Sequence, residues 1–217
     1  MLEKLPDAVG HALSGRHAGL EKTVFRRLDL RAGMGAIEVR SLAFADHAPI
    51  PAQYSADGAG ISPPLQWVGV PSAAASLLLI VEDADAPTPQ PLVHAIVVGL
   101  PAQDGALAEG ALDSAGREDA GFWLGLNSYL QPAWMALDPP PGHGVHRYAF
   151  QLFALQAGAE FSAAPGRDEV VDALSAHAIA SGCLIGTYER PDGSIREPGA
   201  EPAMASATTG GMPAAAA

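Results

Sequence analysis

The chain has one cysteine, Cys183, and few aromatic residues, which make up 6% of its 217 positions. A single cysteine rules out a disulfide within the chain and is typical of proteins in a reducing compartment. No apolar run approaches the ~18 residues that a membrane-spanning helix needs. The first residues also lack the long apolar stretch of a secretory signal. We therefore expect a cytoplasmic protein without a transmembrane segment.

Basic residues are scarce as well. The 12 Lys and Arg stand against 24 Asp and Glu, so the net charge is −12, with +2 on residues 1–33 and −14 on the remainder. An acidic body repels the phosphates of nucleic acid, which argues against DNA or RNA as a partner. The basic arm is either a docking element, for an acidic surface of its own chain, of a second copy or of a partner protein, or an ordinary solvated segment with mixed charge.

Several catalytic signatures are missing. The sequence has no nucleophile elbow, no Gly-rich phosphate loop and no CxxC, which weighs against an enzyme with a covalent intermediate. A metal site built from Asp83, Asp85, His94 and His146 lacks the close histidine spacing of zinc sites. We expect neither a metal nor a cofactor.

What is present is a pattern of β-strands. Residues 76–81 and 92–98 are continuous apolar runs rich in branched side chains, as in strands that are covered on both faces. Residues 147–155 form another strong strand. The weaker elements that the pattern predicts are a strand at 37–44, loops at 46–64 and 102–144, a helix from Asp168 to Ser181-Gly182, and a last strand from Cys183 to Arg190.

The pattern divides the chain into three parts. Residues 1–34 are predicted to form a helical extension, and residues 35–196 a single domain. Residues 197–217 contain Ala, Gly, Pro, Thr and Met without an aromatic residue, so they cannot bury enough apolar surface to offset their ordering entropy. This tail is expected to be disordered.

An acidic stretch follows the first apolar strand directly. Strand alternation places Asp83 and Asp85 on one face, and Pro87 ends the strand. Two such carboxylates can bind an ammonium group, bind a metal or share a proton, unless they are merely a solvated strand end. His94, inside the next apolar strand, is either a core histidine with one hydrogen bond or, with a carboxylate beside it, an acid–base or anion-binding group.

A proline-rich stretch precedes the strongest strand. Pro139 and Pro140 stiffen the backbone, and alternation puts His146 and Tyr148 on one face of the strand. An imidazole and a phenol beside a rigid loop with free N–H groups suit a phosphate or a carboxylate.

Two further side chains of this stretch have other expected roles. Arg147 points to the opposite face and is expected to pair with a buried acid or with loop carbonyls. His143 lies between two glycines and is expected to be exposed to solvent.

In their order and spacing these stretches resemble the phosphatidylethanolamine-binding protein family, in particular its bacterial Raf-kinase-inhibitor-like branch. The resemblance covers residues ~36–190 and is carried by Asp57-Gly58 with Ile61–Trp67, by Asp83–Pro87 with His94, by Pro139–Tyr148 and by Gly186–Arg190. It implies a mainly β fold, an antiparallel β-sandwich with a C-terminal helix, to which this chain adds the N-terminal helical arm.

The resemblance also implies a small pocket at one end of the sandwich that accepts phosphate, acetate or a phosphoethanolamine head group. The residues that would line it are Asp83, Asp85, Pro87, His94, Pro139, Pro140, His146 and Tyr148.

The chain departs from the family pattern at two positions. Ala95 follows the pocket histidine where a tryptophan is usual, and Asp138 stands in a segment that is usually Gly-rich. Two like charges ~4 Å apart at an effective dielectric of about 20 cost roughly 4 kcal/mol. Either Asp138 points away from the pocket, or the pocket prefers a cationic or neutral ligand.

Three functions are compatible with these residues. The first is a non-catalytic protein that binds a small anion or a phospholipid head group and regulates a partner protein. The second is a hydrolase or other acid–base enzyme that uses Asp83, His94, His146 and Tyr148. The third is a protein-interaction module whose pocket is vestigial.

Overall fold

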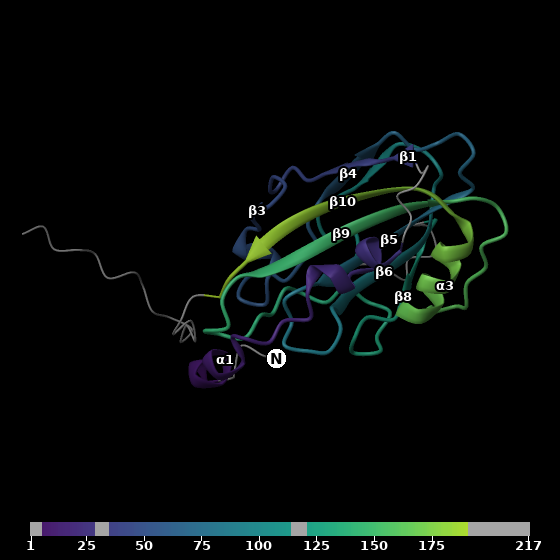
Figure 1. The fold of residues 1–217 in the computed structure, drawn as a ribbon. Helices are drawn as coiled ribbons and strands as arrows, with labels where there is room; N and C mark the ends of the chain where they lie inside the picture. Colours follow the sequence, from purple (N-terminus) through teal and green to yellow (C-terminus); the bar gives the residue numbers. More distant parts are fainter. Residues whose placement is uncertain (1–5, 29–34, 114–120, 191–217) are drawn as a thin grey trace, which may run out of the picture.

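β-strands in two sheets form the centre of the structure, with a few short helices around them (Figure 1). The computed structural model describes residues 6–28, 35–113 and 121–190. The strands are β1 (Gly35–Ala36), β2 (Glu38–Arg40), β3 (Ala48–Pro49), β4 (Leu65–Val68), β5 (Ser76–Asp83), β6 (Leu92–Leu100), β7 (Gly105–Leu107), β8 (Trp123–Gly125), β9 (His146–Leu155) and β10 (Ala178–Tyr188). The larger sheet has the order β1-β10-β9-β5-β6-β8, with β3 also beside β10, and the smaller sheet has the order β2-β4-β7.

The central strands of the larger sheet are antiparallel and are covered on both faces. One face, with Val81 and Phe150, packs against the smaller sheet through Trp67. The other face, with Ile80, packs against α3 (Arg167–His177) through Leu174. The predicted mainly β sandwich and its three strong strands are confirmed, because the apolar runs fill both layers of the core.

The N-terminal arm reaches the face of the larger sheet that α3 covers through its last helix, α2 (Val24–Arg27). The arm consists of α1 (Asp7–Leu13), η2 (Leu20–Lys22) and α2, so the predicted helical arm forms only short helices. Val24 is fully buried in the core on that face. Residues 1–5 and 29–34 lie outside the described parts of the chain.

A buried carboxylate joins the arm to the sheet. Glu82 of β5 accepts hydrogen bonds from the backbone N–H of Val24 (2.7 Å) and from Nε2 of Gln151 (2.9 Å) through Oε2. Its Oε1 accepts a hydrogen bond from Nε of Arg167 over 2.6 Å. Glu82 is fully buried, so one side chain fixes the arm, α3 and the sheet to one another.

The prediction was wrong about where the C-terminal helix ends. α3 ends at His177, and Ala178 already belongs to β10. Ala178 and Ala180 pair with the end of β9, and this sheet pairing outweighs the helical preference of alanine. Of the other weak predictions, the strand at 37–44 is only β2, the two predicted loops contain short strands, and the predicted tail lies outside the described residues.

Several strands of the larger sheet begin or end at the same edge, the one that runs across the strand ends. β5 ends at Asp83 opposite Leu92, where β6 begins, and opposite Tyr148, near the start of β9. Figure 1 shows α1 beside the edge where β9 begins and β10 ends. Side chains from four distant segments are therefore brought to this edge.

Candidate functional site

Asp83 supplies a buried carboxylate at this edge. Val81, two residues earlier, faces the core between the sheets, so strand alternation turns Asp83 to the same side. Its Oδ2 accepts a hydrogen bond from Nδ1 of His146 over 2.8 Å, and its Oδ1 accepts one from the backbone N–H of Asp85 over 2.9 Å. These bonds replace the water that a carboxylate loses on burial.

His94 reaches the same side through a β-bulge. Ala95 pairs with Val81 and Val93 pairs with Glu82, which leaves His94 as an extra residue on β6. The bulge turns His94 toward the core between the sheets, although Val93 before it faces α3. A regular strand with Ala95 facing the inner core would point His94 to the opposite face.

His94 and Tyr148 each present a buried polar atom without a partner among the described residues. Nδ1 of His94 lies 2.7 Å from the carbonyl oxygen of Met135, whereas Nε2 makes no hydrogen bond. The Tyr148 hydroxyl lies near Asp83 but forms no hydrogen bond of acceptable geometry. The two rings meet edge to face with their centroids 5.2 Å apart, so both atoms belong to one cluster.

The protonation states of these two rings follow from their burial. Burial lowers the pKa of His94 and outweighs the opposing charge of Asp83, so the imidazole is neutral near neutral pH. Burial, followed by the charge of Asp83, raises the pKa of Tyr148 well above its usual value. Tyr148 therefore keeps its proton and can donate it in a hydrogen bond.

A chain of histidines links the site to the arm. Nε2 of His146 lies 2.7 Å from Nδ1 of His143, and Nε2 of His143 lies 2.9 Å from the carbonyl oxygen of Leu13 and 3.1 Å from that of Arg16. His143 is only 3% exposed, so the prediction that it faces solvent was wrong. The arm covers it, and burial together with the neighbouring His146 lowers its pKa.

The protons of this chain can be counted. Carbonyl oxygens only accept, so Nε2 of His143 carries a proton, and in a neutral His143 the Nδ1 atom accepts one from Nε2 of His146. The contact between His146 and Asp83 holds a third proton. Three protons on two imidazoles and one carboxylate make the chain neutral overall, with His146 as a cation when Asp83 is ionised.

Asp85 turns away from this group. Its carboxylate binds Arg147 through Nε and Nη2, both at 2.6 Å, and lies 3.5 Å from Nδ1 of His17. Burial opposes ionisation of Asp85, but the bonds and charge of Arg147 outweigh it and lower its pKa. The prediction that Arg147 pairs with a buried acid is confirmed. Pro87 is half-buried in the loop after β5 and makes no hydrogen bond to His94 or Tyr148.

The proline segment, Asp138–Pro141, lies behind the histidines, and its three prolines are buried. The carbonyl oxygen of Pro140 accepts a hydrogen bond from the backbone N–H of His143 over 3.2 Å. The carbonyl oxygen of Pro139 accepts one from Nη1 of Arg190 over 2.6 Å. Both prolines thus fix the backbone that carries His143 and His146.

Arg190 pairs with the unusual carboxylate of this segment. Its Nη1 donates to Asp138 over 2.9 Å and its Nε to Asp57 over 2.8 Å, and its own side chain is fully buried. Asp138 therefore neither points freely outward nor stands as an unpaired charge. Sequence patterns gave no signal for this contact, because the residues are 52 positions apart.

The site thus gathers Asp83, His94, His146 and Tyr148, with His143 behind them. Within the described residues, no group of three His, Cys, Asp or Glu side chains is arranged to hold a metal ion. Over the same residues, no helix has the length and apolar character needed to cross a bilayer. The arrangement offers hydrogen bonds to a small ligand.

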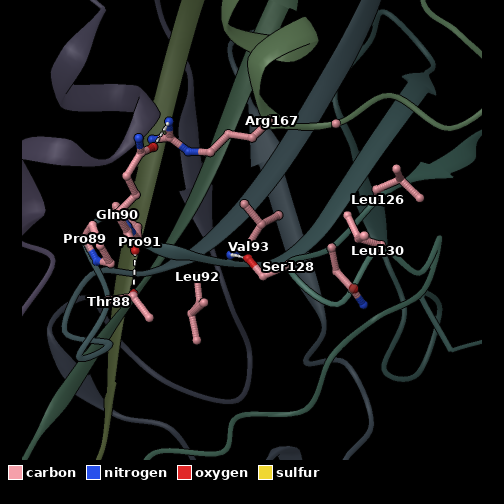
Figure 2. Close-up of a pocket in the computed structure, with 12 residues that line it drawn as sticks. Thr88, Pro89, Gln90, Pro91, Leu92, Val93, Leu126, Ser128, Leu130 and Arg167 are labelled. Atoms are coloured by element: carbon pink, nitrogen blue, oxygen red, sulfur yellow. Dashed lines mark hydrogen bonds between the residues drawn. The ribbon is translucent and has the colours of Figure 1, made fainter.

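A separate groove lies on the outer side of β6 (Figure 2). It has a volume of about 490 Å³ and is lined by apolar side chains that include Leu92, Leu126 and Leu130, with Arg167 at one end. None of the four polar residues of the site lines it.

Comparison with known proteins gives consistent matches over the β-sandwich. A family model described as phosphatidylethanolamine-binding protein matches residues 40–189. A UPF0098 protein from Chlamydia pneumoniae is 41% identical over 158 residues, which are 71% of this chain and 99% of that protein. A UPF0098 protein from Methanothermobacter thermautotrophicus is 36% identical over 154 residues, with 71% and 99% covered.

Solved structures agree with these matches. The crystal structure of a phosphatidylethanolamine-binding protein homologue from Chlamydia trachomatis, CT736, has a TM-score of 0.64 at 36% identity and covers 71% of this chain and 98% of its own. E. coli YbcL, described as a member of the mammalian family of the same name, has a TM-score of 0.63 at 27% identity, with 71% and 98% covered. The matched family segment, residues 40–189, leaves out the arm.

Proposed function

The chain belongs to the phosphatidylethanolamine-binding protein family, and from this premise we propose that its pocket binds a small oxyanion, such as the phosphoryl part of a phosphoethanolamine-type head group. The observation that carries the proposal is the pair of buried, unpartnered polar atoms, Nε2 of His94 and the hydroxyl of Tyr148. Leaving such atoms unpaired costs about 1–3 kcal/mol each. A ligand that bonds to both recovers this free energy.

The charges around the pocket suit a ligand of low net charge. The Asp83–His146–His143 chain is neutral overall, and Arg190 balances one of the two carboxylates that it contacts. The two carboxylates, Asp57 and Asp138, share the single guanidinium of Arg190, so this side of the pocket has an acidic character. A zwitterion, whose ammonium group can face these carboxylates, therefore suits the pocket better than a bare dianion.

The same contacts favour binding over catalysis. Both ring nitrogens of His146 are engaged, by Asp83 and by His143, and Nδ1 of His94 is engaged by Met135. Among these rings, only Nε2 of His94 could act on a substrate, and no Ser or Cys shares a hydrogen bond with it in the described residues. General acid–base catalysis would therefore have to run through Nε2 of His94 and the Tyr148 hydroxyl alone.

Titration calorimetry with phosphoethanolamine and with inorganic phosphate tests the proposal. We expect the wild type to bind at least one of them, and His94→Ala to weaken binding by roughly 10-fold or more through loss of one buried hydrogen bond. The exposed His47, replaced by alanine, is the matched control. If the wild type binds neither ligand, or if both variants bind like the wild type, the pocket does not have this function.

A further inference from the structure

The hydrogen-bonding direction of His94 restricts what the pocket can bind. Nδ1 lies 2.7 Å from the carbonyl oxygen of Met135, and a carbonyl oxygen can only accept. The proton of the neutral ring is therefore on Nδ1, and Nε2 carries a bare lone pair. His94 is 2% exposed, so water does not reach this lone pair freely.

An ordinary oxyanion does not fit such an atom. An ionised oxygen beside Nε2 would place two acceptors against each other in a buried site, where each needs a donor. The Tyr148 hydroxyl, on the ring that meets His94 edge to face, can donate to a ligand but makes no bond to Nε2. A ligand that bridges the two must accept from Tyr148 and donate to His94.

We propose that the pocket binds an oxyanion together with one proton, held between a ligand oxygen and Nε2 of His94. This inference rests on the proposed function and adds the chemical class. A phosphate monoester or phosphonate monoanion has the required P–OH group, with a second pKa of about 6, whereas a sulfate ester has no proton to give.

The other groups that face His94 do not supply this proton. They are Asp83 of β5, His146 and Tyr148 of β9, and Asp138 of the proline segment. Asp83 and His146 are bonded to each other, and Asp138 accepts from Arg190. Only the hydroxyl of Tyr148 has a proton to spare, and that hydroxyl donates to the oxyanion.

Methyl phosphate and methyl sulfate form a matched pair of probes. As monoanions they have the same charge and nearly the same shape, and they differ by one proton. In slightly acidic buffer we expect methyl sulfate to bind the wild type on the order of 10- to 100-fold more weakly, because it leaves the lone pair unpaired. In His94→Gln the amide can donate, so the difference between the probes should fall to within about threefold.

A second measurement does not depend on a variant. Above the second pKa of methyl phosphate, about 6, calorimetry of the wild type in two buffers with different ionisation enthalpies should show uptake approaching one proton per bound ligand. Equal affinities for the two probes, or no proton uptake, overturn this inference while the proposed function stands. Binding of neither probe overturns both.

Discussion

Gly10 of α1 lies directly on the proline segment, so a change at this residue tests whether the arm is seated on that segment. A Cβ atom at residue 10 would lie 1.8 Å from the carbonyl oxygen of Pro141 and 2.8 Å from its carbonyl carbon. The obstacle is backbone that three consecutive prolines stiffen. In Gly10→Ala, α1 must therefore move away from the segment.

Two effects of opposite sign decide the outcome. Alanine improves the intrinsic stability of a helix by about 1 kcal/mol over glycine. Against this, moving α1 withdraws the carbonyl groups of Leu13 and Arg16 from His143, and a buried donor left without its partner costs about 1–3 kcal/mol. The steric overlap adds to that cost, so we expect arm docking to weaken by about 1–2 kcal/mol.

Hydrogen exchange measures this docking directly. The N–H groups of Ala18 and Gly19 donate to the carbonyl oxygens of Ala86 and Ala84 over 3.0 and 2.7 Å. Weakening of about 1–2 kcal/mol should speed their exchange roughly 5- to 30-fold.

The matched control is Gly15→Ala in the same arm, because a Cβ at residue 15 has nothing within 4 Å. Its exchange should stay close to that of the wild type. If Gly10→Ala protects the arm as well as the wild type does, the helix is not seated on the proline segment and this reasoning fails.

Three further predictions concern the buried charges. Glu82→Gln should lower the free energy of unfolding by about 3–5 kcal/mol, because the nearly buried Arg167 loses its carboxylate partner. Urea denaturation measures this loss, and the double variant that also carries Arg167→Gln should recover part of it. The pKa values of His94 and His143 are lowered in the fold, so the unfolded chain binds more protons than the folded one. The stabilising effect of the two neutral rings is therefore complete above pH ~6.5 and is lost as the pH falls below it. A melting temperature that does not change between about pH 7 and about pH 5 would contradict this. Asp138→Asn should tighten phosphate binding about 3- to 10-fold in calorimetry by removing a like charge, and unchanged affinity would show that Arg190 already neutralises it.

Much of the site could be predicted from strand alternation. Asp83 and Tyr148 end up on one face because side chains alternate along β5 and β9 and the register pairs the two residues directly. Arg147 points to the opposite face from Tyr148, as alternation predicts, but its partner Asp85 lies in the turn after β5, where alternation no longer applies, and so does not share the face of Asp83. Periodicity is a local property, so it predicted these orientations well.

The features that could not be predicted depend on contacts between distant segments. The orientation of His94 depends on a bulge in the pairing of two strands, and no residue of β6 signals it. His143 is buried because the arm, about 130 positions earlier in the chain, lies over it. α3 ends at His177 because β9 pairs with the residues that follow. In each case, tertiary structure outweighed the local preference of the sequence.

The nitrogen atoms of the His94 ring allow the most direct test. In ¹⁵N NMR spectra of the free protein, we expect a neutral ring with its proton on Nδ1 and a bare Nε2. Methyl phosphate should then shift the Nε2 resonance strongly and leave Nδ1, bonded to Met135, almost unchanged. A proton on Nε2 in the free protein, or an Nε2 resonance that does not respond to the ligand, would show that His94 does not share a proton with the ligand.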